Sequence, residues 1–578
     1  MGAKKFPADF RWPGTTPPAR DPLTDLFRKM TTMNTGHVSE ALTPYELTRS
    51  ATLPAVLDAY AGAYPGRTLL VTKDRTMTAA EFAESVRSLA ASFHALGLPR
   101  GSAVGILMPN GWKMTAAMLA LNYAGLVAAP LNTWYKTAEL ATARRKAKLT
   151  AIVASPEFYG TDYRGMLADA DLLEADVSHG WLGTFFWTKG ELPDGFEQLP
   201  RLTPEHSTLV SPGDVSMYVF TSGSSAEPKV VVVNHDGLVA NPYQMGRRWT
   251  LTPEDKIWFA APMFFGFGCV NALPVALTHG VPLCLEERFD AAASAQFIED
   301  HKCTVYYGLG PMTRALVAAD AHNKFDISSL RTGPVGFSAE DKRLAVETLG
   351  VTGASSVYGL TESYGNCNVT EPGDPLDVVL HTQGTINSTH KIRCIDPVTD
   401  MEVVPGDSQL LGEIQLSGCV TPGYLDDDVA NSSSFSADGW FRTGDLGWID
   451  NDGRLHFAGR LKEVLKINGI TISPAEVEGF VESHPWVDEA YAFGWTLESD
   501  SEQTLCCAVV LSGKAGDSEG AESMLRSWLR ERVSSYKVPG LFVVMAPGEV
   551  PLTATGKVSK RLIGERHVDS RQTADQSR

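Results

Sequence analysis

The feature that most constrains this chain is a repeated alternation between short apolar runs and amphipathic helical segments, which begins near residue 50. The runs "SAVGILMPN" (102–110) and "LTAIVAS" (149–155) have the composition of buried strands, and residues 82–97 have the spacing of an amphipathic helix that ends at Gly97. Apolar strands separated by helices are typical of parallel sheets with both faces covered. The pattern therefore predicts an α/β fold.

The same alternation resumes after residue 250, and a different pattern of short apolar runs begins later in the chain. From about residue 375, short runs such as "KIRCI", "GEIQLSG" and "GRLHFAG" are separated by Gly and Asp-Gly turns, which indicates a small antiparallel subdomain. The stretch "GRLKEVLKINGITISPAEVE" then opens a unit that we expect to continue as helix, strand, helix and strand to about residue 550. The resumed apolar runs are 256–262, 281–285, 303–310 and 354–360.

A chain of 578 residues is too long for a single hydrophobic core, so two or more domains are expected. We predict a large N-terminal domain over residues 46–460, made of mixed sheets with helices plus a small β-rich subdomain. A small α+β C-terminal domain is predicted over 461–578, with the boundary at Arg460 to Lys462. Residues 1–45, which are rich in Pro and Thr, are predicted to be a loose lead-in.

Charge and composition argue against several classes of protein. The net charge of −18 disfavours a general nucleic-acid binder, although it allows a single phosphate site. The eight cysteines are scattered without metal-site spacing, so we expect reduced thiols in a cytoplasmic chain. The start has no apolar signal core, and the end "TADQSR" is not a peroxisomal signal. The apolar stretch 114–131 contains Asn122, Gly125 and Pro130, which favours a buried helix followed by a strand over a membrane span.

The stretch "TSGSSAEPKVVVVNH" (221–235) places a hydroxyl-rich turn and one lysine between two strand-like runs. Small residues allow backbone amides to converge on an anion, and a lysine adds a point charge for a phosphate oxygen. The turn therefore predicts nucleotide triphosphate binding, although the spacing is not that of a Walker motif. The alternative is a solvated Ser-rich hairpin loop. The predicted phosphate-binding residues are Thr221, Ser222, Gly223, Ser224, Ser225 and Lys229.

Four further motifs carry groups that suit a nucleotide. "YGLTE" (358–362) offers an aromatic face that can stack on a base, and a hydroxyl and a carboxylate that can hold Mg²⁺ beside phosphates. "GWFRTGDLG" (439–447) is expected to place Asp445 in a Gly-flanked turn, where its carboxylate can accept ribose hydroxyls. "GRLKEVLK" supplies Arg460 and Lys466, and "PLTATGKVSKR" supplies Lys557. Each motif alone is more often structural than functional.

Together, in this order and spacing, the motifs resemble the adenylate-forming (ANL) superfamily of acyl-CoA synthetases, peptide-synthetase adenylation domains and beetle luciferases. The resemblance runs from about residue 50 to 565 and includes the segments "PN…LALNYAGLVAAPLN" and "YKVPG". It implies a large N-terminal domain and a small C-terminal domain that turns on a hinge at Lys462. It also implies an AMP-forming acid–thiol ligase that uses ATP, Mg²⁺ and coenzyme A.

The resemblance assigns a role to each motif. Residues 221–229 match the phosphate loop, with Thr221 and Glu362 as metal contacts. Tyr358 and Gly359 match contacts to adenine and the acyl-adenylate, and Asp445 matches the ribose ligand. The remaining matches are Thr361 for ATP and catalysis, Gly336 and Phe337 for the nucleotide, Arg460 for ribose and phosphate, Lys466 and Gly469 for pantetheine, and Lys557 for the catalytic lysine of the first half-reaction.

Two positions depart from the family pattern. The phosphate loop has Ala226 and Val230 where relatives usually have glycine, and side chains there restrict the backbone. In the aromatic motif "PMFFGFG", Phe265 stands where many relatives carry histidine. This second change makes the entrance to the acyl site more apolar.

The aromatic motif also bears on the substrate. "APMFFGFGCVNAL" lacks the carboxylate that would pair with an α-ammonium group, so an amino acid is disfavoured. Phe264, Phe265, Phe267 and Phe337 suggest an apolar or aromatic acyl pocket, while core packing is the alternative for each of them. Fatty, aryl and polycyclic acids are therefore all retained as alternatives for the substrate.

The resemblance and the sequence together suggest the acceptor and the partners. Coenzyme A is the expected acceptor because no carrier domain follows residue 565. A separate acyl carrier protein, a luciferase-like oxygenase and a degenerate binding protein are the alternatives. No nucleic-acid partner is expected, and a homodimer is common among relatives.

Overall fold

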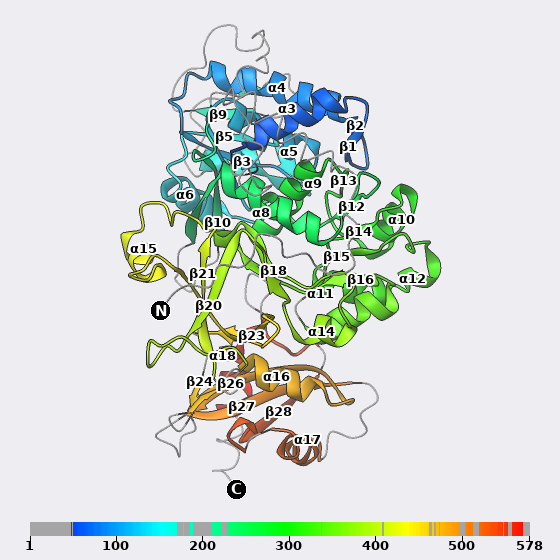
Figure 1. The fold of residues 1–578 in the computed structure, drawn as a ribbon, viewed down its shortest axis with the longest axis vertical. Coiled ribbons are helices and arrows are strands. Elements are labelled where there is room, and N and C mark those ends of the chain that lie inside the picture. Colours follow the sequence, from blue (N-terminus) through cyan, green and yellow to red (C-terminus); the bar gives the residue numbers. More distant parts are fainter. Residues whose placement is uncertain are drawn as a thin grey trace, which may run out of the picture.

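The computed structural model shows a large α/β body that carries the first three quarters of the chain and a smaller body that carries the last part (Figure 1). Several segments lie outside the described residues, among them the lead-in predicted over 1–45. The described residues are 48, 50–169, 177–178, 185–188, 210–221, 228–336, 338–406, 410–461, 465–467, 470–472, 474–496, 503–512, 520–533, 535–546, 548–552 and 558–569.

The first large sheet has seven strands in the order β16-β15-β14-β12-β13-β1-β2, and every neighbouring pair except β1 and β2 is parallel. The apolar runs after residue 250 supply four of these strands, as predicted. The strands are β1 Thr68–Val71, β2 Thr76–Thr78, β12 Ile257–Phe259, β13 Leu283–Leu285, β14 Val305–Tyr306, β15 Thr332–Pro334 and β16 Gly353–Ser355.

The second large sheet also has seven strands, in the order β11-β10-β4-β3-β5-β9-β8. Its centre from β10 to β5 is parallel, and antiparallel pairs form both ends. The strands are β3 Ala103–Leu107, β4 Val127–Pro130, β5 Ala151–Ala154, β8 Val177–Ser178, β9 Phe185–Thr188, β10 Val215–Thr221 and β11 Lys229–Asn234. A separate two-stranded hairpin follows β5 in the sequence and is made of β6 Glu157–Phe158 and β7 Thr161–Asp162.

Helices cover these sheets, and one continuous core joins both (Figure 1). The predicted helix over 82–97 is α4, which begins at a capping box made by Thr78 and Glu81. The apolar stretch 114–131 forms α5 and then β4, as predicted. The helices are α3 Leu53–Ala63, α4 Ala79–Ala95, α5 Trp112–Tyr123, α6 Thr137–Lys146, α7 Tyr163–Asp169, α8 His235–Arg248, α9 Leu273–His279, α10 Ala291–His301, α11 Gly310–Ala318, α12 Ala321–Lys324, α13 Ala339–Arg343 and α14 Leu376–His381.

Smaller antiparallel sheets follow, as the short runs separated by Gly and Asp-Gly turns predicted. The run 354–360, predicted as one strand, is divided at Ser356 between β16 of the parallel sheet and β17 of an antiparallel sheet. The sheets are β17 Val357–Leu360, β18 Gly365–Val369 and β19 Thr385–Ile386, and then β20 His390–Ile395, β21 Gly412–Gly418, β22 Phe441–Ile449 and β23 Leu455–Arg460, with α15 Asp428–Ser434 between β21 and β22.

The last part of the chain has its own cores and differs from the prediction in one respect. Two strands, β26 and β27, stand where one was expected between the helices, because the polar stretch between Thr496 and Gln503 separates two apolar runs. Cys506 and Cys507 are buried in β27, as predicted. The elements are β24 Leu465–Ile467, β25 Ile470–Ile472, α16 Pro474–Glu482, β26 Val487–Thr496, β27 Gln503–Leu511, α17 Ala521–Arg530, β28 Leu541–Met545 and α18 Lys560–Ile563.

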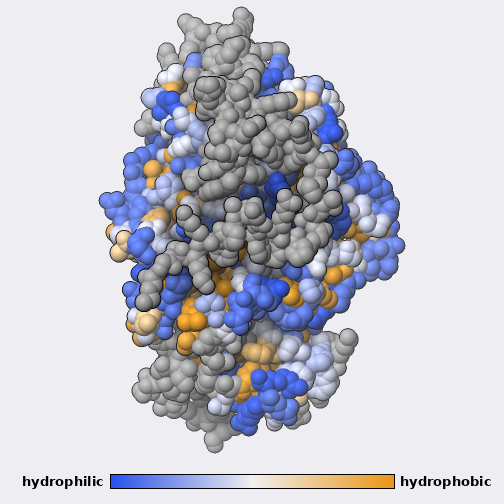
Figure 2. Space-filling view, viewed as in Figure 1, coloured by the Kyte–Doolittle hydropathy of each residue, from blue (hydrophilic) through white to orange (hydrophobic). Residues whose placement is uncertain are grey.

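The described surface is mainly hydrophilic on the face shown in Figure 2, where hydrophobic residues form small separate patches. Among the helices of the described residues, none is both long enough and apolar enough to span a bilayer. All eight cysteines are buried, and none of them is in a disulfide bond.

An ion pair between the buried Asp255 and the partly exposed Arg331 joins the ends of three neighbouring parallel strands. Asp255, just before β12, accepts hydrogen bonds from Arg331 at 2.8 and 2.6 Å and from the Thr304 hydroxyl at 2.6 Å. Burial raises the pKa of Asp255, but the bonds from Arg331, Thr304 and the Thr252 amide outweigh burial and leave the pKa below its usual value. The charged form of Asp255 therefore stabilises the fold.

We predict that Asp255→Asn lowers the free energy of unfolding by about 2–4 kcal/mol, because it leaves Arg331 without its counter-charge. The loss should be constant at neutral pH and shrink only below about pH 4, where the wild-type carboxylate is protonated as well. Urea unfolding of both proteins at several pH values measures it. Asp326→Asn, which removes an exposed partner of Lys302, is the matched control and should leave the midpoint unchanged. Equal midpoints for wild type and Asp255→Asn would contradict the prediction.

Candidate active site

The hydroxyl-rich stretch connects β10 and β11, which pair in antiparallel fashion at the edge of the second sheet. β10 ends at Thr221 and β11 begins at Lys229, and these two residues face each other in the ladder. Thr221 and Lys229 therefore mark neighbouring points at the end of the two strands. The residues between Thr221 and Lys229 that were predicted to bind phosphate, namely Ser222, Gly223, Ser224 and Ser225, lie outside the described residues. Their role stays a prediction.

Val230, one of the two departures from the family pattern, packs in the hydrophobic core. Val230 is 3% exposed and packs with the residues of a second apolar cluster beside the sheet. Its backbone pairs with Phe220 on one side, and its carbonyl accepts a hydrogen bond from the Leu425 amide at 2.9 Å. The side chain therefore belongs to the strand rather than to the loop. Ala226 is outside the described residues.

A segment that the sequence analysis did not single out, residues 421–425, lies against β11. The Val232 amide donates to the Gly423 carbonyl at 3.0 Å, and the ammonium group of Lys229 lies 4.3 Å from the centre of the Tyr424 ring. Such a distance is that of a cation–π contact. The sequence feature that could have identified this segment is the turn "TPGYL", in which an aromatic residue follows Pro and Gly.

The "YGLTE" motif is joined to the same segment. Thr361 and Glu362 form a short 3₁₀ turn directly after β17. Glu362 is 8% exposed, its carboxylate accepts a hydrogen bond from the Tyr424 hydroxyl at 2.7 Å, and its backbone carbonyl accepts one from the Thr421 amide at 2.7 Å. Lys229 and Glu362, both predicted from separate motifs, are therefore neighbours through Tyr424.

Asp445 lies inside strand β22 and not in the turn that was predicted for it. Gly444, with φ of +70°, provides the local irregularity that the sequence suggested, but the chain stays in the ladder, where Asp445 faces Arg460 of β23. The Arg460 guanidinium lies 2.9 Å from one Asp445 oxygen, and the Tyr358 hydroxyl donates to the other at 2.7 Å. The pairing of β22 with β23, together with the Tyr358 side chain from β17, thus assembles a carboxylate with two donors.

Tyr358 is buried rather than open to solvent. Its ring is 4% exposed and lies 5.9 Å from the ring of Phe457. Burial raises the pKa of Tyr358, and the charge of Asp445 raises it further, so the phenol keeps its proton and acts as the donor. An ionised carboxylate offers about four acceptor positions, so Asp445 can accept further hydroxyl groups beside its two protein partners. The adenine contact assigned to Tyr358 stays a prediction.

The aromatic motif packs directly on the "YGLTE" motif. A Cβ placed on Gly266 would lie 2.4 Å from the Thr361 hydroxyl, so only glycine permits this approach. The rings of Phe264 and Phe265 lie 4.5 Å apart, and Trp134, from the loop after β4, contacts both at 5.6 and 5.9 Å. Phe265 and Trp134 are 41% and 61% exposed. These side chains form an aromatic cluster, and its two phenylalanines directly precede Gly266 in the sequence.

The other residues predicted to contact the substrates lie in several different parts of the chain. Phe267 packs on Phe259 and Tyr307 at the surface of the main core, away from that aromatic pair. Gly336 approaches the backbone of Gly310 so closely that an added Cβ would lie 3.0 Å from it. Lys466 is in β24, with its side chain outside the described residues. Phe337, Lys462, Gly469 and Lys557 also lie outside them.

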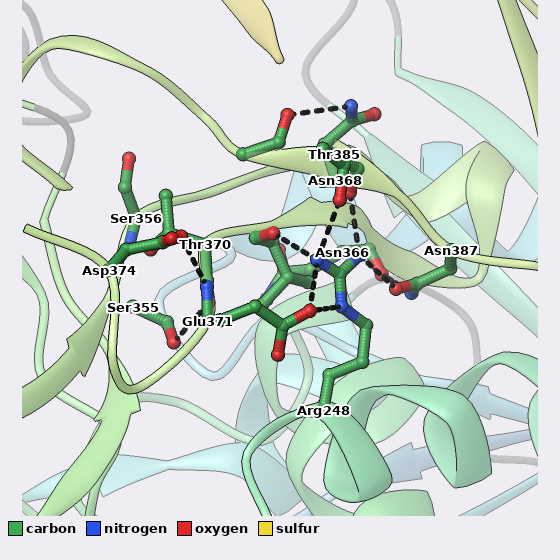
Figure 3. A network of polar contacts seen from close by, with 12 residues as sticks. Arg248, Ser355, Ser356, Asn366, Asn368, Thr370, Glu371, Asp374, Thr385 and Asn387 are labelled. Carbon is green, nitrogen blue, oxygen red and sulfur yellow. Dashed lines mark hydrogen bonds and ion pairs between the residues drawn. The ribbon is translucent and has the colours of Figure 1, made fainter. Parts of the chain in front are cut away.

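A polar network behind the site fixes the β17–β18 hairpin (Figure 3). Arg248 at the end of α8 donates to the carbonyl oxygens of Val369 and Thr385 at 2.6 and 2.7 Å, and it pairs with Glu371. Two turns earlier in α8, the buried amide of Asn241 donates to three carbonyl oxygens around the turn at 361–366. The position of Thr361 and Glu362 is therefore set by α8.

The residues present fit a magnesium ion that arrives with a nucleotide. Within the described ranges, no group of three or more His, Cys, Asp or Glu side chains could hold a metal. Glu362 instead offers a single carboxylate beside the Thr361 hydroxyl. Mg²⁺ is commonly held in this way, by one or two carboxylates with phosphate oxygens and water completing its shell.

Comparisons with known proteins agree with this geometry. The model of the AMP-binding enzyme family matches residues 57–425, and that of the AMP-binding enzyme C-terminal domain matches 476–557. The 3-[(3aS,4S,7aS)-7a-methyl-1,5-dioxo-octahydro-1H-inden-4-yl]propanoyl:CoA ligase of Mycobacterium tuberculosis is 29% identical over 89% of this chain and 98% of its own length. The mitochondrial medium-chain acyl-CoA ligase ACSF2 of Danio rerio is 28% identical over 90% and 88%.

Solved structures share the fold. ATP-bound MatB from Rhodopseudomonas palustris superposes with a TM-score of 0.76 at 23% identity, over 89% of this chain and 98% of that one. The O-succinylbenzoate coenzyme A synthetase of Bacillus subtilis in complex with AMP gives a TM-score of 0.70 at 23% identity, over 87% and 96%. With the first family model matching more than half of its length, the chain belongs to the AMP-binding enzyme family of adenylate-forming proteins.

Proposed function

We propose that this protein is an ATP-dependent acid–CoA ligase that activates a non-amino carboxylic acid as its acyl-adenylate and passes the acyl group to coenzyme A. The observation that carries the proposal is the grouping of Lys229, Glu362 and their link Tyr424 beside the phosphate hairpin. The paired Asp445 and Arg460 supply the groups that suit a ribose. Relatives matched over about nine tenths of their length are acid–CoA ligases.

The first half-reaction must bring two anions together. A carboxylate oxygen of the acid attacks the α-phosphorus of ATP, the new O–P bond forms, and the bond to pyrophosphate breaks. Lys229, Arg460 and Lys557 are the cations that would offset charge on the phosphoryl oxygens, and preorganised charges of this kind are usually the largest contribution to such catalysis. Mg²⁺, held beside Glu362 when bound, would supply further charge neutralisation on the phosphates.

In the second half-reaction, the thiol of coenzyme A attacks the acyl carbonyl and AMP leaves with the electrons of the broken C–O bond. The C-terminal domain would turn about Lys462 to withdraw Lys557 and to bring Lys466 and Gly469 toward the pantetheine arm. Hinge motions of this type are common between catalytic steps. An acyl carrier protein is the alternative acceptor, and a homodimer, which is common among relatives, is a candidate assembly.

The acid is proposed to be apolar and bulky. Trp134, Phe264 and Phe265 form an aromatic cluster next to Gly266, which packs on Thr361, and no ionisable residue is among these three. Pockets of this composition suit fatty, aryl or polycyclic groups. The relative in Mycobacterium tuberculosis is named for a fused-ring propanoyl substrate, which favours the polycyclic class. The eight buried thiols, none of which is in a disulfide bond, favour a reducing compartment, and we propose the cytoplasm.

A panel of fatty, aryl and polycyclic acids tests the reaction class. We expect pyrophosphate release from ATP with at least one member, and thioester formation with that acid only when coenzyme A is present, because the thiol is consumed in the second step. Coupled pyrophosphate detection and mass spectrometry of the thioester measure the two steps. Glycine and phenylalanine serve as amino-acid controls and should be inactive. Release without any thioester would favour a carrier protein or an oxygenase.

Lys557→Ala separates the half-reactions. We expect adenylation to fall by about 10²-fold or more, because a charge aimed at the transition state is lost, while thioester formation from supplied acyl-AMP and coenzyme A continues at a similar rate. Single-turnover assays of each half-reaction measure this. Lys560→Ala is the matched control from the same segment, because Glu478 holds that ammonium group at 2.6 Å. Full-speed adenylation by Lys557→Ala would reject the assigned role.

A further inference from the structure

We infer that Tyr424 is a positioning residue that fixes the phosphate-hairpin lysine and the metal-binding carboxylate relative to each other. Its hydroxyl orients Glu362, and the face of its ring holds Lys229. The inference rests on the proposed function, because it assigns Lys229 to the triphosphate and Glu362 to the magnesium ion that accompanies it. It adds a residue that touches neither reactant in the assignment above.

The backbone of Tyr424 is held from two sides. On one side, residues 421–425 pair with β11, through the Val232 amide on the Gly423 carbonyl and the Leu425 amide on the Val230 carbonyl. On the other side, the Thr421 amide is bonded to the Glu362 carbonyl at 2.7 Å. The short segment 421–425 therefore connects the strand that carries Lys229 with the turn that carries Glu362.

A side-chain clamp adds to this fixation. The amide group of Asn431 in α15 accepts from the Tyr424 amide at 2.7 Å and donates to the Tyr424 carbonyl at 2.8 Å. Gly423, just before Tyr424, has φ of +140°, and an added Cβ would lie 2.6 Å from the Asn431 side chain. The clamp thus depends on a residue without a side chain at position 423. The ring of Tyr424 has little freedom to move away from the site.

The phenol is a permanent hydrogen-bond donor to Glu362. Tyr424 is 7% exposed, and burial raises the pKa of its hydroxyl, with the Glu362 charge raising it further. Ser434 and Arg460 act in the opposite direction but less strongly. The hydroxyl therefore keeps its proton at physiological pH and bonds one carboxylate oxygen at 2.7 Å. Donors that orient a metal-binding side chain in this way typically affect metal affinity about 10–100-fold.

The same ring positions Lys229. The ammonium group lies 4.3 Å from the ring centre, where the negative face of the aromatic system attracts a cation. Because an aromatic ring is rigid, its face and its hydroxyl keep a constant spacing. A single side chain therefore fixes the separation between a cation and a carboxylate that would bind the same polyphosphate. A residue that only filled the core would need neither contact.

Two substitutions separate these roles from packing. Tyr424→Phe keeps the ring and its packing but removes the hydrogen bond to Glu362. We expect its apparent affinity for Mg²⁺ in the presence of ATP to fall about tenfold, while AMP binding without metal is unchanged. Tyr424→Leu also removes the face that holds Lys229, so ATP should bind more weakly even at saturating Mg²⁺. Calorimetry of ATP and AMP binding across a magnesium series, without any acid present, measures both effects.

The control is Tyr60→Phe, which removes a buried phenol bond of 2.7 Å to the Gly280 carbonyl far along the chain from the site. It should leave the magnesium dependence at the wild-type value. Tyr424→Phe with wild-type magnesium dependence, or with AMP binding reduced as much as ATP binding, would overturn the inference. The proposed function fails in a different way, through a wild-type protein that binds ATP but releases no pyrophosphate with any acid.

Discussion

The site depends on placing charged side chains where little water reaches them, and each such charge needs a partner. An ionised carboxylate removed from water costs several kcal/mol unless donors replace its hydration. Asp445, at 1% exposure, receives the Tyr358 phenol and the Arg460 guanidinium, and Glu362 receives the Tyr424 phenol. The carboxylates are therefore held in one geometry before any substrate arrives, which is the condition under which charges contribute most to catalysis.

The donors in turn belong to elements that are fixed by backbone pairing. Tyr358 and Glu362 lie on β17 and the turn after it, and the amide of Asn241 and the guanidinium of Arg248 hold that region from α8. Asp445 and Arg460 face each other across β22 and β23. The site residues thus come from β17 and its following turn, β22 and β23, and α8 holds part of this region. The helix α8 also contributes to the main core.

The aromatic motif shows how the same scaffold can accept a different acid. Gly266 is required because the backbone passes against Thr361, whereas Phe264 and Phe265 on the same loop face Trp134. A glycine that permits a close backbone contact and two phenylalanines of an aromatic cluster are therefore neighbours in the sequence. The role of Phe264 and Phe265 in an acyl pocket stays a prediction.

The sequence by itself determined the large features of the fold. Alternation of apolar runs with amphipathic helices predicted the parallel sheets, and the helix α5 followed by β4 was predicted from the same stretch, because burial imposes periods of two and 3.6 residues on the local pattern. The motifs also predicted site roles for Lys229, Glu362, Asp445 and Arg460, and these roles stay predictions. Only the tertiary structure decided that Asp445 lies in a strand, that the run at 354–360 belongs to two sheets, and that Tyr424 joins Lys229 to Glu362. These features are set by register and contact between segments far apart in the chain, and local spacing carries no record of which strand a residue will face.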